Sequence, residues 1–473
     1  MKVQGRGALA IVYVALAMWL VVPATIALVE AGYWSETELF TSVLLMVVPA
    51  TMLTLSVVSR DHSLAWSIFW AWSLIFLGLA PAYQLSLGML PWGAVLSQTL
   101  VTDAQRVVLL GYLVAIVVFV IASRYAGSRG FTPPRQVDAG SPLQRATVAM
   151  IWVHAGISLL FVALMGTAMY SGRSAFSARL VEIAAIPGIG TAYFLSSAGA
   201  IIVPAIAITI RKMGVPVSAW LVGLSMSVSL LVTNPLIGSR FLTGSFLVAV
   251  TAALLTRTAR RWLPAGVVLL FVTVFPTLDL LRGDGTGATR IEVTDPSTTL
   301  TSLDFDAFEM LYRAVSLNGQ SAHGSPSAGE LLLAPLLRWV PILSDSVQGN
   351  ATGPVVARST GMGFTNVSMP LWGEAFLIGS WLGVVAGFAV LGAVIAATRR
   401  PSSLAGVLLE VPVAALLFIV LRGSLYEVLG YVLLAVVVAW WLSTVEQRGG
   451  RRSQRGRDSG LRAPIASPSA ARD

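Results

Sequence analysis

Long apolar stretches, separated by short polar segments, follow one another along most of the chain. A run of about 18–25 apolar residues is long enough to cross the hydrocarbon core of a bilayer as a helix. In lipid the backbone must be helical, because unpaired N–H and C=O groups are costly there. The pattern therefore predicts an all-α polytopic membrane protein with about twelve transmembrane helices. They are expected near residues 8–29, 37–59, 63–85, 104–123, 147–170, 189–210, 216–237, 241–256, 264–281, 371–397, 403–421 and 425–443.

The composition agrees with a chain that lies mostly in a bilayer. Hydrophobic residues make up 56% of the 473 residues and charged residues only 11%, which is too apolar for a soluble domain. The absence of cysteine excludes a disulfide framework and a thiolate metal site. The net charge of +9 is not accompanied by the pattern of a soluble basic fold, so no nucleic-acid partner is expected.

The basic residues indicate the orientation, because cytoplasmic loops of membrane proteins carry an excess of lysine and arginine. With a cytoplasmic N-terminus and twelve crossings, 21 of the 31 basic residues fall on the cytoplasmic side and the other ten on the outer side. We therefore predict a multi-pass protein of the cytoplasmic (inner or plasma) membrane, with the N-terminus and the C-terminus in the cytoplasm. An alternative count differs by two around residues 216–256, where Asn234-Pro235 interrupts the apolar pattern.

This orientation divides the chain into four parts. Residues 1–281 hold transmembrane helices 1–9, residues 282–370 form one large extracytoplasmic loop, and residues 371–446 hold helices 10–12. Residues 447–473 are rich in Arg, Ser, Pro, Gly and Ala, which predicts a basic, disordered cytoplasmic tail that lies against anionic membrane lipid.

The large loop is predicted to contain short amphipathic helices. One is expected to begin near Ser302, and another to occupy residues 327–339, where Ser327 and Glu330 have the spacing of a capping box. Two further outer elements are a short surface helix within residues 171–188 and an interfacial or re-entrant element at Pro91-Trp92-Gly93. A carrier that only moves solutes rarely needs such a loop, whereas an enzyme that acts on a lipid-linked substrate does.

The outer surface of the membrane has no ATP, so a reaction there needs a donor that arrives already activated, such as a glycan on a lipid diphosphate. Its transfer requires cations that stabilise the departing diphosphate and a carboxylate or imidazole that takes a proton. Arginine suits the first role, because its planar guanidinium binds phosphate oxygens in pairs. The candidates for binding substrate are Arg240, Arg338, Arg358, Arg422, Arg173 and Arg179, and the candidates for catalysis are Glu374, Asp306 and His323.

Each candidate also has a structural role as its alternative. Arg240 and Arg422 lie at predicted helix ends, where arginine side chains commonly extend to the membrane interface. The arginines of the loop have ion pairs within the loop as the alternative. Asp306, like the neighbouring Glu309, has a solvated or helix-capping face as its alternative.

Five short motifs follow one another in the second half of the chain. They are Gly238-Ser239-Arg240, Asp306-Ala307-Phe308, Arg338-Trp339-Val340-Pro341, Gly373-Glu374 and Arg422-Gly423-Ser424. Their order and their placement relative to the spans resemble the Wzy-type O-antigen or oligosaccharide repeat-unit polymerases. The resemblance covers about residues 234–430. In departure from the family pattern, no Lys-Pro pair follows the Arg338 motif, and Ile378 and Ser380 stand where Asn and Gly are common.

The resemblance implies a metal-independent glycosyltransferase of GT-C-like architecture without a cofactor. Such an enzyme polymerises repeat units at the outer face of the membrane, by moving a growing glycan from its polyprenyl (undecaprenyl) diphosphate to the next lipid-linked unit. Arg240, Arg338 and Arg422 would then contact the diphosphate or the glycan, and Glu374 would brace or activate the site. The implied partners are the lipid-linked oligosaccharide, membrane lipid, a chain-length regulator and a flippase.

Other functions stay open at this point. A glycan ligase shares the topology and the donor of a polymerase. A polyprenyl-phosphate-sugar glycosyltransferase usually carries an acidic pair in the first outer loop, where this chain offers only Glu36 and Glu38. A flippase or transporter would use polar groups within spans, such as His154 and Glu410. A scaffold would use the loop for docking. The long outer loop with its arginines argues against a transporter, and the order of the five motifs favours the polymerase.

Overall fold

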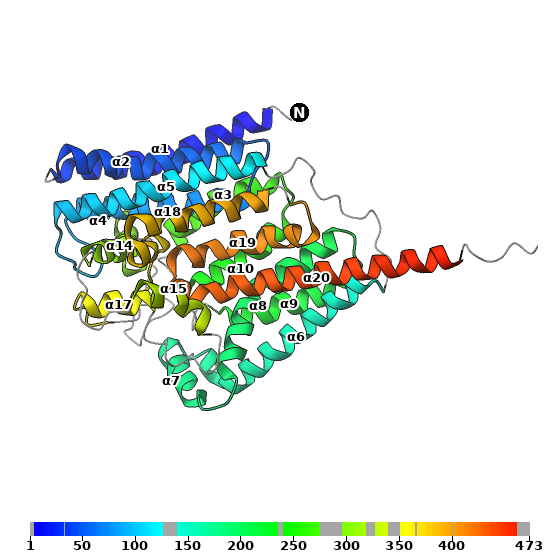
Figure 1. Ribbon diagram of the computed structural model, residues 1–473. Helices are drawn as coiled ribbons and strands as arrows, with labels where there is room; N and C mark the ends of the chain where they lie inside the picture. The colour runs from blue at the N-terminus through cyan, green and yellow to red at the C-terminus, as the bar shows by residue number, and fades with distance from the viewer. Residues whose placement is uncertain are drawn as a thin grey trace, which may run out of the picture.

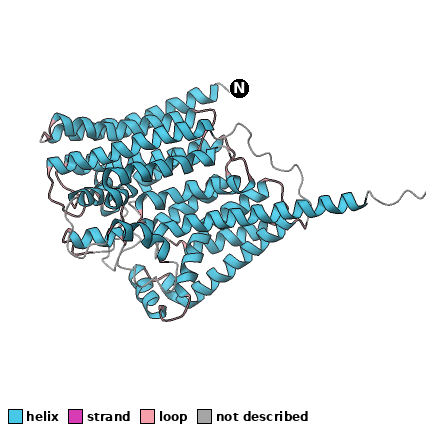
Figure 2. Ribbon diagram, viewed as in Figure 1, coloured by secondary structure: helices cyan, strands magenta, loops and turns pink. Residues whose placement is uncertain are grey.

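The computed structural model describes residues 4–32, 34–125, 140–234, 240–274, 296–317, 327–338, 351–364, 367–399 and 401–460. Within these ranges the chain forms helices and turns without β-strands (Figure 2). Nine helices in the same ranges are long and apolar enough to cross a membrane. The predicted class, an all-helical polytopic membrane protein, is thus confirmed at this level.

The nine long helices coincide with nine of the predicted spans. α6 begins earlier than predicted, because the Ser141 side chain caps it by accepting a hydrogen bond (3.1 Å) from Gln144 N. The long helices are α1 (Gln4–Ala31), α2 (Glu36–Val58), the rod of α3 (Leu64–Ser73), η1 (Leu74–Leu79) and α4 (Ala80–Ser86), α5 (Gln98–Tyr125), α6 (Pro142–Met165) with η2 (Gly166–Met169), α8 (Ile189–Lys212), α18 (Leu371–Arg399), α19 (Leu404–Arg422) and α20 (Leu425–Gly460).

The helices at the other three predicted spans are shorter than the nine long helices. α9 (Ala219–Val232) has 14 residues and α10 (Arg240–Leu254) has 15, so at about 1.5 Å per residue each covers only about 22 Å. Both nevertheless pack against α8 inside the bundle. The span expected at 264–281 is described only as far as α11 (Leu263–Leu269) and η4 (Leu270–Val274). The count of twelve crossings therefore stays a prediction.

The rod formed by α3, η1 and α4 lies in the core of the bundle, and every residue of α3 and η1 is buried. Aromatic rings connect it to its neighbours. Trp72 stacks on Trp372 of α18 with 5.9 Å between ring centroids, and Phe76 stacks on Phe305 of the large loop at 5.2 Å. The rod thus holds both α18 and the loop segment around Phe305 in fixed positions.

Four short helices gather at one end of the bundle, which we call the loop end (Figure 1). They are α7 (Arg173–Ile183), α14 (Ala307–Ser316), α15 (Ala328–Leu337) and α17 (Thr352–Ser359). The start of α1 and the projecting part of α20 lie at the opposite end, which we call the terminal end. An even number of crossings requires the two ends of the chain to lie on one side in this way.

Within the large loop, α15 confirms the predicted capping box: Ser327 Oγ accepts from Glu330 N (3.2 Å), and Ser327 N donates to the Glu330 carboxyl (2.6 Å). α14 begins at Ala307, later than predicted, because the short 3₁₀ turn η5 (Leu303–Phe305) precedes it. α13 (Pro296–Leu300) and α17 are additional helices that the polar sequence did not indicate.

α20 continues to Gly460, whereas the sequence predicted an irregular tail from residue 447. Once a helix is nucleated, each further residue costs little to add. Glu446, Gln447 and Arg448 are good helix formers that extend the apolar helix beyond its expected end. The predicted disorder of residues 461–473 lies outside the described residues.

α18 contains a kink at Gly379 and Ser380. Ser380 has φ 51° and ψ −140°, a left-handed backbone conformation that L side chains adopt only with strain. Glycine adopts positive φ without this cost, because it has no Cβ atom. The kink therefore places a serine where the backbone favours glycine.

We expect Ser380→Gly to raise the free energy of unfolding by about 1 kcal/mol, because relief of the strain outweighs the added freedom of the unfolded chain. Thermal unfolding of the purified protein measures the change. Ser380→Ala keeps the Cβ atom and is the control, which should not stabilise the protein. Equal stabilisation by both variants would point to the hydroxyl group instead of the backbone.

Candidate functional site

The turn that contains Trp92 attaches α14 to the bundle. Trp92 N donates to the carboxyl of Glu309 (2.5 Å), and the Trp92 indole N–H donates to the carboxyl of Asp306 (2.9 Å). Arg313 donates to Glu309 (2.6 Å) and to the main-chain oxygen of Trp92 (3.3 Å). Asp306 and Glu309 are only 2% and 0% exposed, so the alternative of a solvated face is wrong. Burial raises the pKa of both carboxyl groups, although these hydrogen bonds oppose the shift.

A short loop segment holds both Arg240, at the start of α10, and Arg422, at the end of α19. Nη2 of Arg240 lies 2.5 Å from Oδ2 of Asp304. Arg422 donates a hydrogen bond to the main-chain oxygen of Asp304, and Nη2 of Arg422 lies 3.2 Å from Oδ1 of Asp306. Two arginines that the sequence analysis selected separately are therefore parts of one ion-pair network.

The guanidinium of Arg422 is restrained on a further side by an aromatic ring. Its Cζ atom lies 4.2 Å from the ring centroid of Phe241, and the whole residue is only 8% exposed. A guanidinium that is stacked and ion-paired has little rotational freedom left to lose when it binds a ligand. Arg422 is thus prearranged, with one edge at the wall of a cavity.

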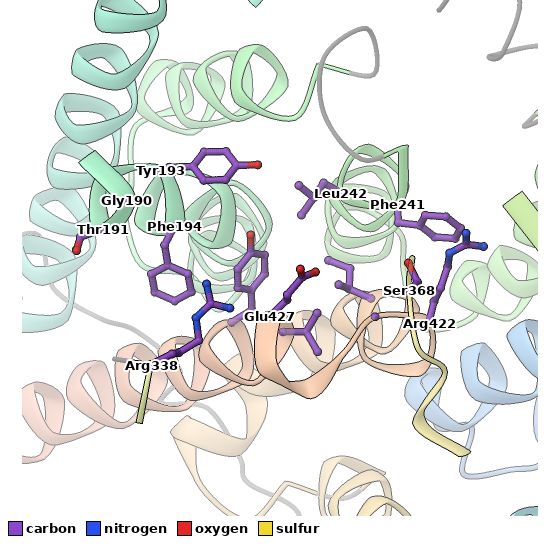
Figure 3. Close-up of a pocket in the computed structure, with 14 residues that line it drawn as sticks. Gly190, Thr191, Tyr193, Phe194, Phe241, Leu242, Arg338, Ser368, Arg422 and Glu427 are labelled. Carbon is purple, nitrogen blue, oxygen red and sulfur yellow. The ribbon is translucent and has the colours of Figure 1, made fainter. Parts of the chain in front are cut away.

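This cavity has a volume of about 650 Å³ and lies at the loop end, between α8, α10, α19 and α20 (Figure 3). Arg338 and Arg422 lie on either side of Glu427 in the view of Figure 3. Four of its lining residues are aromatic, and a small number of polar groups among aromatic and aliphatic side chains is typical of a ligand site. The other lining residues are Gly190, Thr191, Tyr193, Phe194, Phe241, Leu242, Ser368, Ile419, Gly423, Val428 and Tyr431.

Arg338, the C-cap residue of α15, reaches the cavity from the large loop. It donates a hydrogen bond (2.6 Å) to the main-chain oxygen of Tyr426, and its Cζ atom lies 4.3 Å from the centroid of the Tyr426 ring. These contacts join α15 to the first turn of α20. The loop therefore contributes one of the two arginines of the cavity, and the helix bundle contributes the other.

Glu427, in the first turn of α20, is a charged lining residue that was not among the candidates from the sequence. Its side chain is accessible and faces the cavity between the two arginines (Figure 3). The sequence could have indicated it, because Glu427 is an ionisable residue just inside the last predicted span. A carboxyl group inside a membrane is energetically costly and is therefore usually functional. The Arg422-Gly423-Ser424 motif a few residues earlier also indicated its position.

Glu374 lies behind the cavity and does not line it. Its carboxyl accepts hydrogen bonds from Thr352 Oγ1 (3.0 Å), Ser424 Oγ (3.1 Å) and Leu425 N (2.6 Å). The last of these is an N–H group at the start of α20, which has no partner inside the helix. Glu374 thus fixes the α19–α20 turn, from which Arg422 and Glu427 project.

The remaining candidates are not among the cavity-lining residues. Arg179 donates to the main-chain oxygen of Leu164 (3.1 Å) and pairs with Glu182 (2.7 Å), so it holds α7 to the end of α6. Arg358 is exposed in the last turn of α17. Arg173 begins α7. The position of His323 lies outside the described residues.

In the described part of the chain, no three histidine, aspartate or glutamate side chains are close enough together to hold a metal ion. Comparison with protein-family models, with curated proteins and with solved structures found no match.

Proposed function

We propose that the protein is a glycosyltransferase that polymerises polyprenyl-diphosphate-linked oligosaccharide repeat units at the outer face of the cytoplasmic membrane. The observation that carries this proposal is the cavity at the loop end, which two guanidinium groups and one carboxyl group line together with aromatic and aliphatic side chains. Guanidinium groups bind diphosphate oxygens in pairs, and a carboxylate accepts a proton. Transfer from a lipid diphosphate needs both.

In the proposed reaction, a hydroxyl group of the incoming lipid-linked unit attacks the anomeric carbon of the growing glycan. The bond between that carbon and the diphosphate oxygen breaks, and the diphosphate leaves with the electron pair. Arg338 and Arg422 bind the diphosphate and stabilise its developing charge. Glu427 takes the proton of the attacking hydroxyl. The products are a longer glycan on the second lipid and free polyprenyl diphosphate.

Arg240 and Glu374 act through other residues in this account. Arg240 is ion-paired to Asp304, whose main-chain oxygen binds Arg422. Glu374 holds the turn between Arg422 and Glu427 through three hydrogen bonds. Both are positioning residues, because neither lines the cavity.

The glycan ladder of a strain that lacks the gene tests the proposal. We expect single repeat units to accumulate on the lipid carrier at the outer face, and a plasmid copy of the gene to restore the ladder. Full-length chains that stay on the lipid would point to a ligase. Repeat units trapped on the cytoplasmic side would point to a flippase. Either of these outcomes would contradict polymerisation.

The positioning role of Glu374 predicts different results for two substitutions. Glu374→Gln keeps an acceptor oxygen for Leu425 N, and its amide can donate to the hydroxyls of Thr352 and Ser424, so transfer should stay within about threefold of wild type. Glu374→Ala leaves buried donors unsatisfied, at roughly 1–3 kcal/mol for each group, and should lower both the unfolding temperature and the transfer rate. Activity assays and thermal unfolding of both variants check this. A glutamine variant that is stable but inactive would instead assign Glu374 to the chemical step.

A further inference from the structure

A second pocket, of about 260 Å³, lies at the terminal end of the bundle. It is formed where the α2–α3, α10–α11 and α18–α19 connections meet, and five arginines line it: Arg60, Arg257, Arg260, Arg261 and Arg399. Val407 and Glu410, in the first half of α19, also line this pocket, whereas Ile419 and Arg422, at the other end of the same helix, line the first cavity. The two pockets therefore lie towards opposite ends of α19.

Three of the five arginines fix the walls of the pocket. Arg260 donates to the main-chain oxygen of Ala252 (2.6 Å) and pairs with Glu410 (3.1 Å). Arg261 donates to the carbonyl groups of Val57 (3.0 Å) and Ser59 (2.9 Å) at the end of α2. These contacts satisfy carbonyl groups that have no partner inside their helices.

Arg399, at the end of α18, completes this set by donating to the main-chain oxygen of Asp61 (3.1 Å) and lying 3.7 Å from its carboxyl. The pocket is thus held by ends of α2, α10 and α18. A ligand there would meet a preformed wall.

The charge of the pocket is not balanced by its own residues. Five arginines face two carboxyl groups, Asp61 and Glu410, which leaves a formal charge of +3 (5 − 2) on the lining. Arg60 and Arg257 are exposed, and no carboxylate partner is recorded for either within the described residues. The pKa of His62, which also lines the pocket, is lowered to about 4 by burial and by the charges of Arg261 and Arg260. The imidazole is therefore neutral and adds no charge of its own. The arginines alone give the pocket its excess of positive charge, which favours an anion.

We propose that this pocket binds the phosphate group of an anionic phospholipid from the membrane leaflet at the terminal end. The volume is below the roughly 300–1,000 Å³ of sites for drug-sized ligands, which suits a phosphate headgroup better than a nucleotide or a glycan. Basic pockets between transmembrane helices are suited to anionic lipid headgroups.

A lipid is favoured over a soluble anion by the surroundings of the pocket. Trp262 follows the lining residue Arg261 and is 47% exposed, and Leu254, at the end of α10, is 53% exposed. Tryptophan is enriched at the level of lipid headgroups. A ligand with acyl chains would contact this apolar surface while its phosphate occupied the arginine pocket. Since the ligand would bind only the folded bundle, it would stabilise it.

Thermal unfolding in lipid nanodiscs tests this proposal. Wild-type protein in phosphatidylcholine with added phosphatidylglycerol should unfold about 2 °C or more above the same protein in phosphatidylcholine alone. The double variant Arg60→Gln/Arg257→Gln should lose this difference, because it removes the two exposed guanidinium groups of the pocket. The matched control is Arg124→Gln/Arg211→Gln, which removes two exposed arginines from the last turns of α5 and α8 outside the pocket, and it should keep the difference.

Three results would overturn the proposal. They are equal unfolding temperatures of wild type in both lipid mixtures, a difference that survives in the pocket variant, and a loss that is as large in the control. Inorganic phosphate added to phosphatidylcholine nanodiscs forms a separate arm. An equal stabilisation by free phosphate would assign the pocket to a soluble anion instead of a lipid. None of these measurements depends on glycan transfer, so they test the lipid site independently of the proposed function.

Discussion

Glu427→Gln should lower the rate of glycan transfer by about 10²–10⁴-fold, because it removes the proposed proton acceptor and leaves the shape of the cavity unchanged. Initial rates of the purified variant, with lipid-linked repeat units as substrate, measure the loss. The side chain faces the cavity and is accessible, so the substitution should not lower the unfolding temperature. Binding of the lipid-linked donor should be retained, since the two arginines remain.

The control for this variant is Glu36→Gln. Glu36 is exposed at the start of α2 and does not line the cavity, so the same change of charge should leave the rate as it is in wild type. A Glu427→Gln protein that transfers glycan within about twofold of wild type would exclude Glu427 as the base.

Arg422→Lys should lower transfer by at least about tenfold while the protein still folds. Lysine keeps a positive charge near Asp306, but it lacks the planar fork that binds two phosphate oxygens together. The expected signature is weaker binding of the lipid diphosphate, seen as a raised KM for the donor. Steady-state kinetics with increasing donor concentration measure it.

A second pair of variants separates binding of substrate from folding. Arg422→Ala leaves the buried Asp306 carboxyl without its ion-pair partner, and loss of one partner of a buried pair costs roughly 3–5 kcal/mol. Combining it with Asp306→Asn removes the unpaired charge and should restore the unfolding temperature without restoring transfer. Recovery of transfer in the double variant would show that Arg422 only supports the structure.

The long helices were predictable, because a run of about 18–25 apolar residues rarely forms anything other than a membrane-spanning helix. The capping box of α15 was predictable for a similar reason, since Ser327 and Glu330 contact each other through the backbone between them. The helix α9 (Ala219–Val232) is shorter than the span expected at 216–237, whereas α10 (Arg240–Leu254) lies within two residues of the expected 241–256.

The candidate site was predictable only in part. Arg240 and Arg422 were recognisable as arginines at helix ends, but their shared partner Asp304 lies 118 positions before Arg422 in the chain, and only the folded loop brings them together. Glu427 was missed because its carboxyl gains a role from Arg338, a residue of a distant helix that lines the same cavity. Local sequence patterns do not contain such long-range contacts.

We propose that Arg338, Arg422 and Glu427 form one site that transfers a glycan between lipid diphosphates. The most direct test incubates the purified protein with a polyprenyl-diphosphate-linked oligosaccharide and separates the products by size. The account predicts lipid-linked glycans of two or more repeat units, with one polyprenyl diphosphate released for each new linkage. Folded protein that releases no polyprenyl diphosphate and forms no longer glycan would contradict it.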